Sequence, residues 1–252
     1  MPRGARQLRH PVAEYLHDPT QGPRASISAF PATLVRHYAA PGADGARFVQ
    51  RTDNRQLDLL ADVCDPGVAA VRNGYLRSSD IAQPAVFARA LEDRFESIAI
   101  GVHDGAEVVL GADWTGRVDG APHRTIAQVL TSTIAGGMYG SLDEDAAGAT
   151  IYRQLQRAAY LGTLLAAAAL GKRRVALTLI GGGVFANPIG AIWDAILWTS
   201  DQIVPFLHAE LLIVVNGRSL GAELPPAELR AAARARGGDL VRFDRSGAAF
   251  AA

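Results

Sequence analysis

Apolar residues follow two different spacings along the chain. In some segments they recur every three or four residues, which is the spacing of one face of a helix. These segments are 54–63, 84–97, 145–170, 188–204 and 225–236. Elsewhere they form short runs between Gly, Pro, Asn or Asp residues, which predicts strands. These runs are 68–71, 97–102, 125–133, 175–180, 209–217 and 239–243.

Strands and helices alternate in the C-terminal half, and this order is typical of a mostly parallel sheet with helices on both faces. Apart from Thr178, the run 175–180 is apolar, so we expect a strand that is buried on both faces. Gly171 directly follows the long helix 145–170 and fits the position after its last turn. The chain therefore reads as an α/β protein, with an N-terminal tail or cap over 1–26 and one domain over 27–252.

Composition narrows the class of protein. Hydrophobic residues make up 49% of the 252 residues and charged residues 20%, which indicates a folded globular chain. The formal net charge is zero, so we expect no nucleic-acid partner. The most apolar window, 160–171, is too short to span a bilayer, and we expect no membrane partner. The first residues lack the apolar core of a signal peptide, and Cys64 is the only cysteine, so we expect a cytoplasmic location.

Three consecutive glycines, Gly181, Gly182 and Gly183, follow the apolar run 175–180. Glycine there costs backbone entropy but allows positive φ and close approach of the backbone to a ligand. Asn187 fits the N-cap of the next helix, and Pro188 fits its first turn. Because a helix N-terminus favours anions, this loop is predicted to hold a phosphate or diphosphate. A packing turn without a ligand is the alternative.

Two well-known phosphate motifs fit this loop poorly. A Walker loop is excluded because no Gly-Lys-Ser/Thr follows the glycines. Gly181, Gly183 and Ala186 satisfy the dinucleotide pattern G-x-G-x-x-G/A only loosely. The next predicted strand ends at 216–217 without the carboxylate that a Rossmann fold places there. A Rossmann-type NAD(P)-binding oxidoreductase therefore remains only as an alternative function.

The stretch AAYLGTLLAAAALGKRRVALTLIGGGVFANP resembles the C-terminal half of macrodomains, which are ADP-ribose-binding three-layer α/β/α sandwiches. Gly183, Val184, Phe185, Ala186 and Pro188 occupy the places of the family's diphosphate loop. The segments RNGYL and GVHDGAEV make the chain look most like the branch of arginine-specific ADP-ribosyl hydrolases. The resemblance covers about 60–216, and the family's usual glycine-rich first loop is replaced by 75–80.

The resemblance implies a ligand and a set of contacts. The loop from Gly181 to Phe185, with Val184, would wrap the diphosphate of ADP-ribose, and Phe185 would lie against the distal ribose. Asn73, at the end of the predicted strand 68–71, would face the same ribose. Asn187 belongs to this ligand-binding set as the expected helix cap. The expected partner is ADP-ribose or an ADP-ribosylated protein, and no cofactor is expected.

Removal of ADP-ribose from arginine requires carboxylates that activate water or hold the guanidinium group. Three aspartates flanked by loop residues are candidates for this role: Asp104, Asp113 and Asp119. Each also fits an ordinary Asp-Gly turn. No metal ligands are expected, because the histidines and the cysteine lack metal-ligand spacing. A reader that binds ADP-ribose without hydrolysing it is the alternative to the hydrolase.

Overall fold

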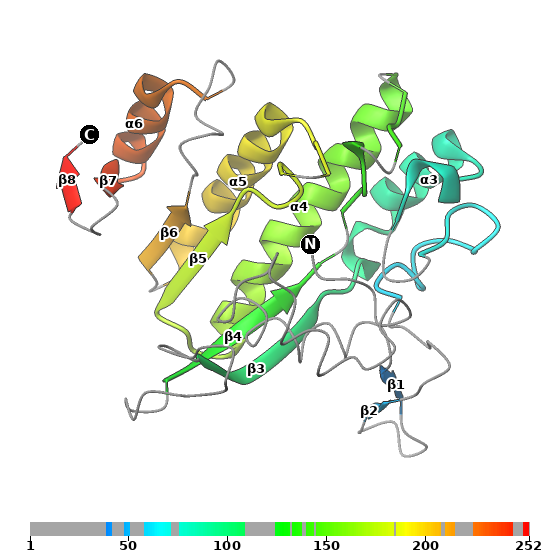
Figure 1. Ribbon diagram of the computed structural model, residues 1–252, viewed down its shortest axis with the longest axis horizontal. Helices are drawn as coiled ribbons and strands as arrows, with labels where there is room; N and C mark the ends of the chain where they lie inside the picture. The colour runs from blue at the N-terminus through cyan, green and yellow to red at the C-terminus, as the bar shows by residue number, and fades with distance from the viewer. Residues whose placement is uncertain are drawn as a thin grey trace, which may run out of the picture.

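The computed structural model describes most of the chain between residues 58 and 243. The described residues are 39–41, 48–50, 58–71, 76–108, 124–131, 133, 134–137, 140–143, 145–183, 185–207, 210–214, 224–243 and 249–251. The predicted tail over 1–26 lies outside them. Helices and strands are mixed, as the sequence predicts for an α/β protein (Figure 1).

The described helices match the predicted ones with small shifts at their ends. They are α3 (Pro84–Asp93), α4 (Ala146–Ala169), α5 (Ile189–Ile203) and α6 (Pro226–Ala235). Short 3₁₀ helices occur at η2 (Ser78–Asp80), η3 (Phe95–Ser97) and η5 (Val204–Phe206). Figure 1 shows α3, α4 and α5 side by side, and both β4 and β5 contact α4. The candidate site lies where α5 begins, beside α4.

The described strands form two-stranded pairs. The antiparallel pairs are β1 (Ala39–Pro41) with β2 (Phe48–Gln50), β3 (Gly101–Val108) with β4 (Arg124–Leu130), and β7 (Val241–Phe243) with β8 (Ala249–Ala251). The parallel pair is β5 (Arg174–Thr178) with β6 (Glu210–Val214). Within the described strands the prediction of a mostly parallel sheet is therefore wrong. The α/β class is confirmed, and the three-layer sandwich stays a prediction.

Both ends of α4 follow directly from the sequence. The Asp145 side chain accepts a hydrogen bond from the Gly148 N–H at 2.7 Å and so caps the first turn. At the other end Gly171 has φ +61°, and the Lys172 N–H donates to the Ala167 carbonyl at 2.8 Å. This is the Schellman arrangement expected for a glycine after the last turn. The prediction for Gly171 is confirmed.

Strand β5 differs from its prediction in burial. Val175 and Leu177 are buried, whereas Arg174, Ala176 and Thr178, which alternate with them, are exposed. Only one face of the strand packs against the helices, so the expectation of burial on both faces is wrong. Small residues on the second face hid this alternation, because Ala counts as apolar in the pattern although it loses little when it is exposed.

Other predicted elements are shorter or displaced. Residues 58–63 form turns instead of the last part of a helix, and 68–71 contribute one bridge, between Ala69 and Ile81. The strand predicted over 97–102 begins at Gly101 and continues to Val108. The bounds of β3 are set by its hydrogen bonds to β4. The local pattern of apolar residues does not show where such a partner strand begins and ends.

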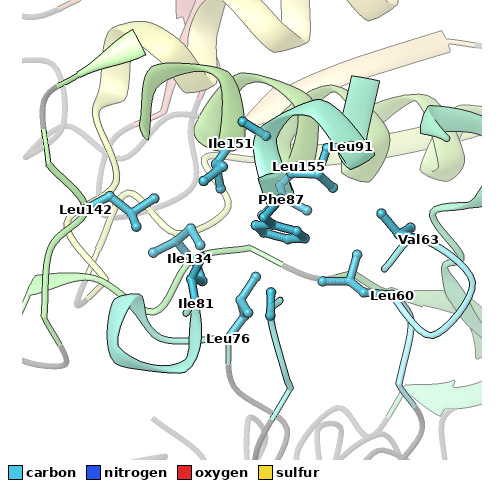
Figure 2. Close-up of a cluster of buried hydrophobic side chains, with 12 residues drawn as sticks. Leu60, Val63, Leu76, Ile81, Phe87, Leu91, Ile134, Leu142, Ile151 and Leu155 are labelled. Atoms are coloured by element: carbon cyan, nitrogen blue, oxygen red, sulfur yellow. The ribbon is translucent and has the colours of Figure 1, made fainter. Parts of the chain in front are cut away.

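Helix α4 contributes to two buried clusters. Its first half packs Ile151 and Leu155 against Phe87 and Leu91 of α3, in the cluster drawn in Figure 2. Its second half packs with β5, α5 and α6, through residues such as Tyr160 and Leu164. Gln156 and Tyr160, the polar side chains of α4 that face the candidate site, lie where the first cluster ends at Leu155 and the second begins with Tyr160 itself. Packing on both sides holds this part of the helix in place.

Candidate functional site

The glycine loop joins the carboxyl end of β5 to the start of α5. Its first part is a turn in which the Gly182 N–H donates to the Leu179 carbonyl at 3.1 Å. Gly181, the third residue of this turn, has φ +81°. A positive φ at that position defines a type II turn, which favours glycine. An added Cβ at Gly181 would also approach the Asn187 Nδ2 atom at 2.8 Å.

Asn187 fastens the loop and does not cap the helix. The N-cap of α5 is Pro188, which makes no side-chain capping bond, so the predicted capping role of Asn187 is wrong. The Asn187 side chain is 3% exposed and turns inward. Its Nδ2 group donates to the carbonyls of Ile134, Gly181 and Phe185 at 2.9, 3.2 and 3.4 Å. The side chain lies inward, and does not cap α5, because the inward position supplies a donor to these carbonyls.

Two side chains of α4 hold the loop from beneath. The Tyr160 hydroxyl donates to the Thr178 carbonyl at 2.7 Å and accepts from the Ile180 N–H at 3.0 Å. The Gln156 Nε2 group donates to the Ile180 carbonyl at 3.2 Å and to the Asn187 Oδ1 atom at 3.5 Å. Gln156 and Tyr160 are one helical turn apart on a buried face.

Sequence reasoning missed both residues. One sequence feature could have identified them. Gln156 and Tyr160 are four residues apart on a face of α4 that is otherwise apolar. Buried polar groups are kept where they have partners, and such a pair on a core face indicates a backbone segment to be held.

Tyr160 gives a prediction about stability. Replacement by Phe removes a hydroxyl that donates to the Thr178 carbonyl and accepts from the Ile180 N–H. These two groups then keep only the 2.9 Å hydrogen bond that they make with each other. The free energy of unfolding should fall by about 1–3 kcal/mol. Urea unfolding of wild type and Tyr160→Phe measures this difference. A variant as stable as the wild type would contradict the role of Tyr160 in fastening the loop.

The same variant should change how stability depends on pH. Burial raises the pKa of Tyr160 above its ordinary value, against a smaller opposing effect of the hydrogen bond from Ile180. Because the folded state keeps this proton longer than the unfolded state, the stabilising contribution is complete below the unfolded pKa of about 10. It is lost as pH rises above that value toward the folded pKa. Unfolding free energy should therefore decline less steeply in alkali for Tyr160→Phe than for wild type.

The start of α5 presents unpaired donors. The first hydrogen bond within the helix runs from the Ile192 N–H to the Pro188 carbonyl at 3.1 Å. Within the described part of the chain, the N–H groups of residues 189–191 therefore have no partner, and neither do those of Gly181 and Gly183. Unpaired N–H groups at a helix N-terminus, beside a glycine loop, form a favourable environment for an anion.

A second loop lies against the glycine loop. Leu76 forms a parallel bridge with Ile134, and the Ala135 N–H donates to the Leu76 carbonyl at 2.7 Å. A Cβ added at Gly136 would meet the Phe185 carbonyl oxygen at 2.5 Å. A Cβ added at Gly140 would meet the Ser78 Oγ atom. The described residues of three segments therefore lie together at one end of β4 and β5: 76–80, 134–137 with 140, and 181–183 with 185–187.

The structure brings together most of the predicted ligand-binding residues. Gly181, Gly182, Gly183, Phe185 and Asn187 share the loop. An added Cβ at Gly182 would meet Ile189 and Ile192, whereas none of the described atoms lies within 4 Å of one at Gly183. Gly183 is thus the glycine that faces open space.

Two predicted ligand contacts lie outside the described residues. Val184 is one of them, and Asn73 is the other. Leu76, three residues after Asn73, lies at the same end of the strands as the glycine loop, through its bridge to Ile134.

Asp104 lies away from the glycine loop. Its carboxylate pairs with the Lys172 Nζ atom at 2.8 Å, and this hydrogen bond lowers the pKa of Asp104 below its ordinary value. Lys172 precedes β5, whereas the glycine loop follows it, so the strand separates the two. The structure therefore does not bring Asp104 to the loop.

Asp113 and Asp119 lie outside the described residues, between β3 and β4. The ends of those strands, Val108 and Arg124, pair with each other, and β4 then runs toward Ile134. The catalytic role expected of either carboxylate therefore stays a prediction.

Comparison with protein-family models, with curated proteins and with solved structures finds no match to this chain. Among the described residues, no helix has the length and apolar character needed to cross a bilayer. The same residues contain no group of three or more His, Cys, Asp or Glu side chains placed to hold a metal ion. The site is therefore defined by its own geometry.

Proposed function

We propose that the chain binds ADP-ribose at the glycine loop, in a macrodomain-like three-layer arrangement. The observation that carries this proposal is the set of unpaired N–H groups of Gly181, Gly183 and residues 189–191 around one loop. A diphosphate offers several anionic oxygens at a spacing that one loop and one helix N-terminus can satisfy together. Phe185, beside these donors, supplies an apolar surface for the distal ribose.

The neighbouring loop supports a ligand larger than a single phosphate. Segments 76–80 and 134–137 lie beside the glycine loop, so they would contact a nucleoside diphosphate sugar on sides that the loop does not cover. Glycines at 136 and 140 keep these segments close, because a side chain at either position would collide with its neighbour. Asn73 is proposed to reach the distal ribose from the segment that continues into Leu76.

We further propose that the site hydrolyses ADP-ribosyl-arginine. Water would attack the anomeric carbon as the bond to the guanidine nitrogen breaks, and the leaving guanidine would take up a proton. A carboxylate must accept the proton of the attacking water. Asp80 lies in η2, which follows the Leu76–Ile134 bridge, and Asp143 follows Gly140, whose added Cβ would meet Ser78 of η2. Asp104 lies at the other end of β5. We therefore assign the carboxylate role to one of these two residues.

Turnover on an arginine-ADP-ribosylated protein tests this proposal. Wild type should release free ADP-ribose, and either Asp80→Asn or Asp143→Asn should reduce the rate by about 100-fold or more while ADP-ribose still binds. Asp104→Asn is the matched control and should keep full activity. Binding without release by wild type would contradict the hydrolase and favour the reader. Tighter binding of NAD than of ADP-ribose would contradict both and favour the oxidoreductase.

A further inference from the structure

We infer that Gln156 is a positioning residue that aims the Gly181 N–H at the ligand. This inference rests on the proposed function, because it concerns the same loop. Gln156 is 1% exposed and lies on α4, beneath the loop. It contacts no ligand itself, and it acts through the peptide that joins Ile180 to Gly181.

The trans geometry of that peptide fixes the direction of the Gly181 N–H. The chain contains no cis peptide bonds among its described residues. In a trans peptide the C=O and N–H groups point in opposite directions. Since the Ile180 carbonyl accepts from Gln156 on the α4 side, the Gly181 N–H points away from α4. That direction is the side of the loop opposite α4, on which the proposed ligand would lie.

The orientation of the Gln156 amide is fixed by its neighbours. Both atoms near Nε2, the Ile180 carbonyl oxygen and the Asn187 Oδ1, are acceptors, so the NH₂ group must face them. Asn187 cannot rotate its own amide, because its Nδ2 group serves three backbone carbonyls. The Gln156 Oε1 atom is left buried without a hydrogen-bond partner in the described part of the chain. An unpaired buried oxygen is unfavourable. The hydrogen bonds of the NH₂ group to Ile180 and Asn187 explain why a glutamine occupies this position nevertheless.

Because residue 181 is glycine, the peptide between Ile180 and Gly181 has two accessible orientations. A type II turn becomes a type I turn when its central peptide rotates, and the third residue then changes from positive to negative φ. Glycine accepts both values. In the rotated state the Gly181 N–H would point toward α4 and be lost to a ligand. Donation from Gln156 to the Ile180 carbonyl selects the state that exposes the N–H.

Replacement of Gln156 by Glu puts a hydrogen-bond acceptor in place of the Nε2 donor. A carboxylate only accepts, so it repels the Ile180 carbonyl and attracts the Gly181 N–H. Hydrogen exchange of the Gly181 amide, measured by NMR without ligand, should slow by about tenfold or more. Affinities for ADP-ribose and inorganic pyrophosphate should fall about 10- to 100-fold. Gln154→Glu, on the same helix, is the matched control and should change neither quantity.

Loosening of the loop alone would speed the exchange of the Gly181 amide, so the direction of change separates positioning from general support. Unchanged or faster exchange in a folded Gln156→Glu variant would overturn the inference. If that variant does not fold, Gln156→Met tests the same point: affinity should fall severalfold, and unchanged affinity would overturn the inference. Slowed exchange in Gln156→Glu, together with no ADP-ribose binding by wild type, would refute the proposed function and support the orienting role.

Discussion

Asn187→Ala should lower the free energy of unfolding by about 2–3 kcal/mol. The variant removes a buried donor and leaves the carbonyls of Ile134, Gly181 and Phe185 without it. It also removes one of the two acceptors of the Gln156 Nε2 group and the hydrogen bond that joins the loop to Ile134, in the segment after β4. Chemical denaturation of wild type and variant measures the change.

Two further variants make this prediction specific to the donor. Asn187→Asp keeps the shape but replaces the NH₂ group with an oxygen that faces three carbonyls, and it should be at least as harmful as Asn187→Ala. Gln202→Ala removes an exposed amide from α5 and should change stability by less than about 0.5 kcal/mol. A loss below that value for Asn187→Ala would contradict the fastening role.

Gly183→Glu should abolish measurable binding of ADP-ribose, with a loss of affinity of at least about 100-fold. The position is open, so the carboxylate is expected to fit without disturbing the fold and to occupy the space of the diphosphate. Its negative charge would repel the ligand and compete for the same N–H groups. Isothermal titration calorimetry on wild type and variant measures the loss.

Gly183→Ala is the matched control, because it adds a side chain at the same place without a charge. It should keep affinity within a few-fold of wild type. The neighbouring position would be a poor choice for this experiment, since a side chain at Gly182 meets Ile189 at 2.5 Å. Equal binding by Gly183→Glu and wild type would place the ligand away from this loop.

The sequence predicts the backbone frame of the site well. Helices α3, α4, α5 and α6 appear where apolar spacing places them, because each buries one continuous face. Asp145 and Gly171 mark the ends of α4 as expected, since capping depends on neighbours in the chain. The strand–glycine–helix order around Gly181 also follows from local pattern alone.

The contacts that shape the loop could not be predicted in the same way. Asn187 serves Ile134, more than fifty residues earlier, and Gln156 reaches Ile180 from another helix. Local rules placed Asn187 at the helix cap, whereas tertiary hydrogen bonds decide its position. The sequence makes Asp104 a candidate because its segment follows a predicted strand, whereas β3 continues through it and its carboxylate pairs with Lys172. The place of a residue along a hairpin depends on how the two strands pair. The pattern of apolar and polar residues in one strand does not show this pairing.

Mapping of ADP-ribose binding by ¹H–¹⁵N NMR tests the central claim most directly. Addition of the ligand should shift the amide signals of Gly181, Gly183 and residues 189–191 more than any others among the described residues. Signals near Asp104 and Lys172, beyond the other end of β5, should stay unchanged. No shift at the loop, or shifts confined to the Asp104 end, would contradict the claim that this loop binds the diphosphate.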